Sequence, residues 1–81
     1  MTFDLIEKFV ESKDMMGKPV NIFFKQRNTI EGVFIQAKDY QEMKLKNFWR
    51  IVAGPNIAEW QKTKDMNLAK LFSGSDFTRL K

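Results

Sequence analysis

The hydrophobic pattern is clearest in residues 29–47, where two apolar stretches flank a short polar segment. The first stretch is nearly continuous in apolar residues and contains Gly32. A glycine inside a strand usually marks a bulge, a sharp bend or a close backbone approach. After the polar segment at 38–42, Met43 and Leu45 alternate with lysines, which is the period-two pattern of a half-buried strand. The pattern therefore predicts two strands, the first bent at Gly32, with the polar segment at the rim of a small barrel.

A helix is predicted near the N-terminus, over residues 4–14. Asp4 can cap it, because Glu7 follows three residues later as in a capping box. Its apolar residues share one stripe: Leu5, Ile6, Phe9 and Val10. A short amphipathic helix gains most of its stability from what it packs on, so we expect it to cover an open end or face of the sheet. Gly17 is the expected stop signal.

Five strands are predicted in the rest of the chain. These are residues 18–25, residues 29–38, residues 42–52, residues 57–62 with apolar character resuming at 67–72, and residues 76–80. The intervening segment 63–67 fits a bulge, a helical turn or a loop. Turn residues at 53–56 and 73–75 separate the last strands. The chain is thus predicted to be one domain, residues 1–81, mostly β and α+β by count, in which a helix precedes a strongly bent five-stranded antiparallel barrel over 18–80.

Composition narrows the possible functions. A chain of 81 residues buries only about 60% of its unfolded surface, so its own core is marginal. It has no cysteine and no histidine, which excludes disulfides and Cys/His metal sites and removes the usual catalytic bases and thiols. We therefore expect no enzyme activity, metal or cofactor, and we expect stabilisation by oligomerisation. Without a signal-peptide pattern or a membrane-length apolar run, a cytoplasmic protein with no membrane partner is expected.

The net charge of +4 is unevenly distributed. Residues 1–17 carry two basic and four acidic side chains, whereas residues 18–81 carry the remaining twelve basic and six acidic ones. A basic domain of this kind favours polyanions such as nucleic acid. The alternative interpretation is a basic surface that serves solubility alone.

Two segments of the predicted sheet each contain a glycine. The first, residues 32–45, has a strand glycine, an apolar run, an aromatic residue eight positions later and an alternating strand. The second, residues 71–77, is a short turn around Gly74 between the last two strands. Together with the order of one helix and five bent strands, these segments resemble the Sm/LSm family of RNA-binding proteins, which includes bacterial Hfq. The resemblance covers roughly residues 4–80 and implies an Sm-like small barrel.

The resemblance also implies nucleic-acid-binding positions. Tyr40 keeps the family's aromatic residue, and stacking on a base needs only a ring. Lys38 and Glu42 stand where uridine-binding members carry aspartate and asparagine, and Ser73 stands where they carry a basic residue. An ionised Glu42 only accepts hydrogen bonds, so the uridine preference is not carried over. With lysines contacting phosphates, the expected nucleic-acid-binding residues are Lys38, Tyr40, Glu42, Lys44, Lys46, Ser73, Gly74 and Ser75.

Residues 46–67 form a longer connection than the family's minimal loop between the third and fourth strands. This connection either extends the basic aromatic surface or forms an enlarged hairpin with a small core of its own. For Trp49 and Trp60, burial in a core or a subunit interface is the favoured interpretation. The basic residues that would extend the surface are Arg50, Lys62 and Lys64.

Two functions are compatible with these patterns. The first is a non-catalytic Sm-like protein that forms a homo-oligomeric ring through its edge strands and binds single-stranded nucleic acid, RNA rather than DNA, in RNA or DNA processing or chaperoning. An open sheet exposes edges that invite pairing, and a head-to-tail contact whose rotation closes makes a ring. The second is a structural or adaptor barrel that self-assembles or docks a protein partner without binding nucleic acid.

Overall fold

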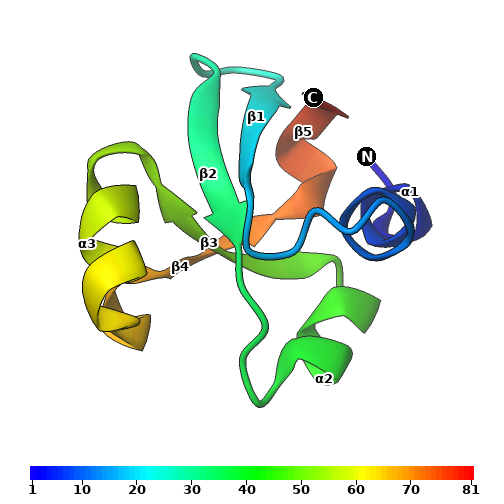
Figure 1. Cartoon of the computed structure of the whole chain (residues 1–81). Coiled ribbons are helices and arrows are strands. Elements are labelled where there is room, and N and C mark those ends of the chain that lie inside the picture. The colour runs from blue at the N-terminus through cyan, green and yellow to red at the C-terminus, as the bar shows by residue number, and fades with distance from the viewer.

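An N-terminal helix precedes five antiparallel strands in the computed structural model, which describes all residues from Met1 to Lys81 (Figure 1). Helix α1 (Phe3–Glu7) continues as a π-helical turn, Lys8–Ser12. The strands are β1 (Pro19–Phe24), β2 (Ile30–Phe34), β3 (Phe48–Ala53), β4 (Lys70–Ser73) and β5 (Phe77–Leu80). Helices α2 (Tyr40–Leu45) and α3 (Ile57–Thr63) and the 3-10 turns Gly54–Asn56, Met66–Leu68 and Gly74–Asp76 lie in the connections.

All five strands form one antiparallel sheet in the order β4-β3-β2-β1-β5. The predicted N-terminal helix and five-stranded antiparallel sheet are therefore confirmed. The sheet is open, because β4 and β5 lie at its two edges and pair only with β3 and β1. It does not close into the expected barrel. Helical turns occupy more of the chain than strands do, so α+β is the accurate class.

Hydrophobic side chains fill both faces of the sheet. The larger core lies between the sheet and the helices α1 and α2, which approach one face (Figure 1). Its fully buried members include Ile6, Val10, Ile22, Phe34, Trp49, Ile51 and Phe77. The smaller core lies on the other face under α3 and joins Val33, Ile35, Val52 and Ile57, with Trp60 and Leu68 packed against it. The connection 46–67 thus contains a helix rather than a hairpin, and it shares its small core with the segment of β2.

Gly32 allows β2 to bend closely over its neighbours. A Cβ atom at this position would lie 2.6 Å from Cγ2 of Ile51 and 3.0 Å from Cδ1 of Ile22. Glycine is therefore needed for close packing, as expected for a glycine inside a bent strand.

Residues 40–45 form helix α2, so the predicted start of a strand near Glu42 is wrong. The alternation of Met43 and Leu45 with lysines also fits a helix, because Tyr40, Met43 and Lys44 fall at helical spacing on one face. The segment consists mostly of good helix formers. The helix ends at Asn47, whose φ of 62° is the left-handed conformation that stops helices and that asparagine tolerates.

Residues 57–63 form helix α3, so the predicted returning strand at 57–62 is also wrong. Ile57 and Trp60 stand three positions apart and face the smaller core. The Thr63 hydroxyl donates to the carbonyl of Glu59, and Lys64 ends the helix with a φ of 56°. The ambiguous segment 63–67 contains the end of this helix and part of a 3-10 turn. None of the helices has the length and apolarity that crossing a membrane requires.

Candidate nucleic-acid interface

Tyr40 lies at the start of α2 with its ring turned into the larger core. Only 8% of the residue is exposed, and its ring packs edge-on against Trp49 with centroids 6.1 Å apart. Its hydroxyl donates a hydrogen bond of 2.5 Å to Oε2 of Glu11. Burial raises the pKa of the Tyr40 hydroxyl far above its ordinary value, and the Glu11 carboxylate adds to this shift. The ring therefore has no free face on which a base can stack.

Lys44 is enclosed by two carboxylates from the N-terminal helix. Its Nζ lies 2.5 Å from Oε2 of Glu7 and 2.9 Å from Oε2 of Glu11, and 10% of its side chain is exposed. The hydrogen bonds that Lys44 donates to Glu7 and Glu11 raise the pKa of Lys44, and the hydrogen bonds that Glu11 accepts from Tyr40 and Lys44 lower the pKa of Glu11. Lys44 thus joins α2 to α1 and offers no free charge to a phosphate.

The other predicted residues on and before α2 are exposed but do not form a pocket together. Lys46 pairs with Glu42 at 3.7 Å, one helical turn earlier. Lys38 borders a shallow pocket that also includes the ion pair of Asp39 with Arg50. Hydrogen bonds from the Arg50 guanidinium hold the pKa of Asp39 below its usual value.

The turn Ser73–Gly74–Ser75 meets the end of α2 through Asn47. The Gly74 amide donates to the Asn47 carbonyl at 2.7 Å, and the hydroxyls of Ser73 and Ser75 lie 2.7 Å apart. The Asn47 side chain donates to the carbonyl of Met1 and accepts from Nε1 of Trp49. The second motif segment therefore contacts the chain just after the first one, through part-buried structural contacts of Asn47 rather than through the predicted binding side chains.

Arg27, in the β1–β2 turn, forms a cluster that sequence reasoning missed. Its guanidinium carbon lies 4.8 Å from the ring centroid of Phe24 and 5.9 Å from that of Phe72. The two rings are half-buried, with centroids 6.1 Å apart. A guanidinium on aromatic faces is the arrangement that also accepts a nucleobase by stacking.

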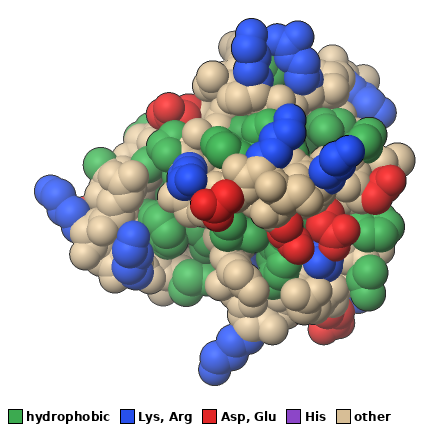
Figure 2. Space-filling view, turned by 45° about the vertical axis from the view of Figure 1, so that its right-hand side comes forward, with side chains coloured by type: hydrophobic (Ala, Val, Ile, Leu, Met, Phe, Trp, Pro, Cys, Tyr) green, Lys and Arg blue, Asp and Glu red, His purple; other side chains and the backbone are tan.

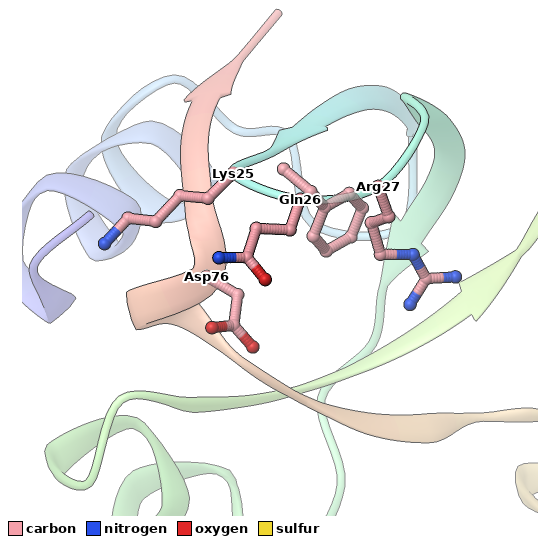
Figure 3. Close-up of a pocket in the computed structure, with 5 residues that line it drawn as sticks. Lys25, Gln26, Arg27 and Asp76 are labelled. Carbon is pink, nitrogen blue, oxygen red and sulfur yellow. The ribbon is translucent and has the colours of Figure 1, made fainter.

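Two adjoining pockets share Arg27 and Asp76, and together we call them the Arg27 groove. The first, of about 240 Å³, is lined by Phe24, Lys25, Gln26, Arg27 and Asp76 (Figure 3). The second, of about 480 Å³, runs along β4 and the end of β3, and its lining includes Pro55, Asn56, Lys70, Leu71, Phe72 and Ser73. Strand β4, at the edge of the sheet, thus forms one wall of the groove.

The basic side chains of the groove are free of acidic partners. All five ion pairs of the chain involve Lys18, Lys44, Lys46 or Arg50. Lys25, Arg27 and Lys70 make none. Figure 2 shows Lys and Arg side chains gathered at the top of the molecule, over the end of the sheet that carries the β1–β2 turn. The groove therefore combines basic side chains that make no ion pair with half-buried aromatic rings.

A local signal for this site was present in the sequence, since Phe23 and Phe24 directly precede Lys25, Gln26 and Arg27. The contributions of Phe72 and Asp76 depend on pairing between distant segments and carry no local signal. No cluster of three or more acidic side chains able to hold a metal ion is found. Comparison of the chain with family models, curated proteins and solved structures found no match in any of the three.

Proposed function

We propose that this chain is a non-catalytic, Sm-like protein of the cytoplasm that binds single-stranded nucleic acid, RNA rather than DNA, as a homo-oligomeric ring. Its role would be in RNA or DNA processing or chaperoning. The single observation that supports binding is the Arg27 groove, where an unpaired guanidinium lies over two half-buried aromatic rings. The groove takes the place of the Tyr40 site expected from the sequence.

The chemistry of the groove suits a flexible polyanion. Stacking on Phe24, Phe72 and the Arg27 plane tolerates any base, because every base has a π-face. Lys25 and Lys70 stand at different parts of the groove and carry no competing ion pair, so they can contact successive phosphates. This combination favours a single strand with unstacked bases over a rigid duplex.

The open sheet supports the proposed assembly. Strands β4 and β5 are the two edges, and a small chain of this kind benefits from covering them. In the proposed ring, β4 of one subunit pairs with β5 of the next, which is a head-to-tail contact. Because β4 also lines the Arg27 groove, each junction would carry one groove. Repeated weak sites around a ring gain affinity by acting together.

The test is fluorescence anisotropy of labelled single-stranded RNA and DNA at two salt concentrations, with the molecular mass recorded on the same sample. We expect salt-sensitive binding by a species larger than a monomer. Arg27→Ala is expected to weaken binding by about tenfold and to reduce the salt slope by about one. Lys62→Ala, which removes the same charge from the exposed side of α3, is the matched control and is expected to change affinity little. Equal affinities for the wild type and Arg27→Ala would contradict the proposal.

A second function, docking of a protein partner by a structural or adaptor sheet, is favoured by a different observation. Phe48 and Leu71 are 37% and 45% exposed and lie on the same face of the β3–β4 pair, where Phe48 faces Ser73 and Arg50 faces Leu71. Docking through such apolar side chains would persist at high salt, whereas phosphate binding would weaken steeply. Phe48→Ser, outside the groove, would weaken protein docking and leave oligonucleotide binding to the monomer unchanged.

A further inference from the structure

One side chain of the Arg27 groove does not fit a site that binds phosphate alone. Asp76 lines both pockets of the groove, is exposed, and makes none of the chain's ion pairs. Neither Lys25 nor Arg27 lies within ion-pair distance of its carboxylate, although both line the same pocket. A free carboxylate repels phosphate, so it weakens a purely electrostatic site.

The position of Asp76 is fixed while its side chain stays free. Its carbonyl accepts a hydrogen bond of 2.9 Å from the amide of Lys25. The next residue, Phe77, is fully buried and pairs with Phe24 across β1 and β5. The last residue of the 3-10 turn is thus held against the first residue of the β1–β2 turn. The backbone of Asp76 therefore keeps a constant place in the wall of the pocket, and its carboxylate is available to a ligand.

Gln26 shares this part of the pocket with Asp76. In Figure 3 the amide of Gln26 and the carboxylate of Asp76 lie next to each other, while Lys25 and Arg27 extend to opposite sides. A carboxylate accepts hydrogen bonds from hydroxyl groups, and a glutamine amide both donates and accepts. The pocket therefore combines a hydroxyl-binding pair with flanking cations and an aromatic ring.

A ribonucleotide presents groups that complement each of these side chains. Its base stacks, its phosphates are anionic, and its ribose carries a 2′-hydroxyl that both donates and accepts. DNA presents the same base and phosphates and lacks the hydroxyl. For DNA the Asp76 carboxylate would contribute only repulsion, whereas for RNA a hydrogen bond offsets that repulsion.

We propose that Asp76, assisted by Gln26, binds the 2′-hydroxyl of a ribonucleotide whose base stacks on Phe24 and Arg27 and whose phosphate contacts Lys25. The Arg27 groove then selects RNA over DNA by this hydrogen bond. The inference rests on the proposed function, since it assigns the discriminating residue within the same groove.

The experiment compares three labelled 12-nucleotide oligomers of identical base sequence: oligouridylate, oligodeoxyuridylate and 2′-O-methyl oligouridylate. We expect the wild-type protein to bind the ribo-oligomer about fivefold more tightly than the other two, because both lack a donating 2′-hydroxyl. Asp76→Ala is expected to bring all three affinities close together. Glu59→Ala removes the same charge from the exposed side of α3 and is expected to keep the wild-type ratio.

The outcomes separate this inference from the function on which it rests. An unchanged RNA-to-DNA ratio in Asp76→Ala, or equal wild-type affinities for the three oligomers, overturns the role of Asp76. If Arg27→Ala still weakens binding in that case, the groove remains the binding site. Failure of the wild type to bind any oligomer overturns both proposals. Circular dichroism of each variant verifies that the fold is kept.

Discussion

Tyr40 shows how the partner of a side chain decides its role. Because its neighbours in the sequence are charged, the ring is expected to be exposed at the rim of a small barrel. In the structure, the carboxylate of Glu11 accepts from its hydroxyl and the ring packs against Trp49. A buried tyrosine usually finds such a partner for its hydroxyl, because an unpaired one is costly. The partner comes from the π-helical turn that follows α1, 29 positions earlier in the chain.

Replacing Tyr40 by phenylalanine removes the hydroxyl and keeps the ring. We expect the free energy of unfolding to fall by about 1 kcal/mol, because Glu11 loses one hydrogen bond but is exposed enough for water to replace part of it. Urea unfolding monitored by tryptophan fluorescence measures this change. Oligonucleotide affinity is expected to stay at the wild-type value. If the variant lost oligonucleotide affinity and kept its free energy of unfolding, Tyr40 would belong to the binding site after all.

The acid sensitivity of the fold depends in part on Glu11. Its pKa is lowered in the folded state, first by the hydrogen bond from Tyr40 and then by that from Lys44. A lowered pKa gives stability that is present above the unfolded value of about 4.3 and is lost as pH falls through the folded value. Glu11→Gln should therefore be less stable than the wild type at pH 7 and closer to it at about pH 3. Urea unfolding at the two pH values tests this, and a constant difference would contradict it.

At the scale of elements, the N-terminal helix and the strands β1, β2 and β5 could be predicted because their periodicity and turn residues are local. Helix α2 could not be predicted in this way. Residues 42–46 are too few for the sequence pattern to distinguish a strand from a helix, and the structure decides by burial: Leu45 is 69% exposed whereas Lys44 is buried. The reason is the pair of carboxylates, Glu7 and Glu11, that α1 and the π-helical turn after it bring to Lys44.

The candidate site likewise has one part that the local sequence reveals and one part that depends on contacts between distant segments. The sequence alone could reveal the part formed by Phe24, Lys25 and Arg27, because these residues lie within four positions of one another. Their junction with Phe72 and Asp76 arises from the pairing of β1 with β5 and from the approach of β4, which no local pattern reveals. The aromatic residue singled out by the family resemblance, Tyr40, is instead enclosed by contacts from α1.

The turn between β4 and β5 depends on close approach to α2. A Cβ at Gly74 would meet the side chain of Asn47 and lie 2.5 Å from Cδ1 of Ile6. Asn47 cannot easily move, because it holds the Met1 carbonyl and the Trp49 indole. Gly74→Ala is therefore expected to lower the free energy of unfolding by about 2–3 kcal/mol.

The matched control for that substitution is Gly17→Ala. A Cβ at Gly17 meets no atom within 4 Å, and only its φ of 81° opposes a side chain. We expect this variant to lose about 1 kcal/mol, the usual penalty of a left-handed conformation. Thermal unfolding of both variants measures the difference. A loss for Gly74→Ala no larger than that for Gly17→Ala would contradict the packing argument.

For the whole molecule, the separation of charges matters more than their sum. Acidic residues of α1, of the π-helical turn after it and of α2 neutralise Lys44 and Lys46 locally. The basic residues of the Arg27 groove and of the two sheet edges stay unpaired. Lys70 lies on β4 and Arg79 on β5, so the proposed pairing of these edges would bring like charges toward one another. A bound polyanion relieves this repulsion.

This arrangement predicts opposite effects of salt on assembly and on binding. Raising salt from about 0.05 M to 0.5 M shortens the screening length from well over 10 Å to a few ångströms, which weakens the repulsion between Lys70 and Arg79 of adjacent subunits. Sedimentation should therefore show stronger assembly at high salt or with added oligonucleotide, while oligonucleotide affinity falls as salt rises. Lys70→Ala should assemble more strongly at low salt than the wild type, and Lys62→Ala on α3 should not. Assembly that weakens as salt rises would mean that ion pairs hold the subunits together. That result would contradict the pairing of β4 with β5. It would favour an interface in which the acidic face of α1 contacts a basic sheet edge.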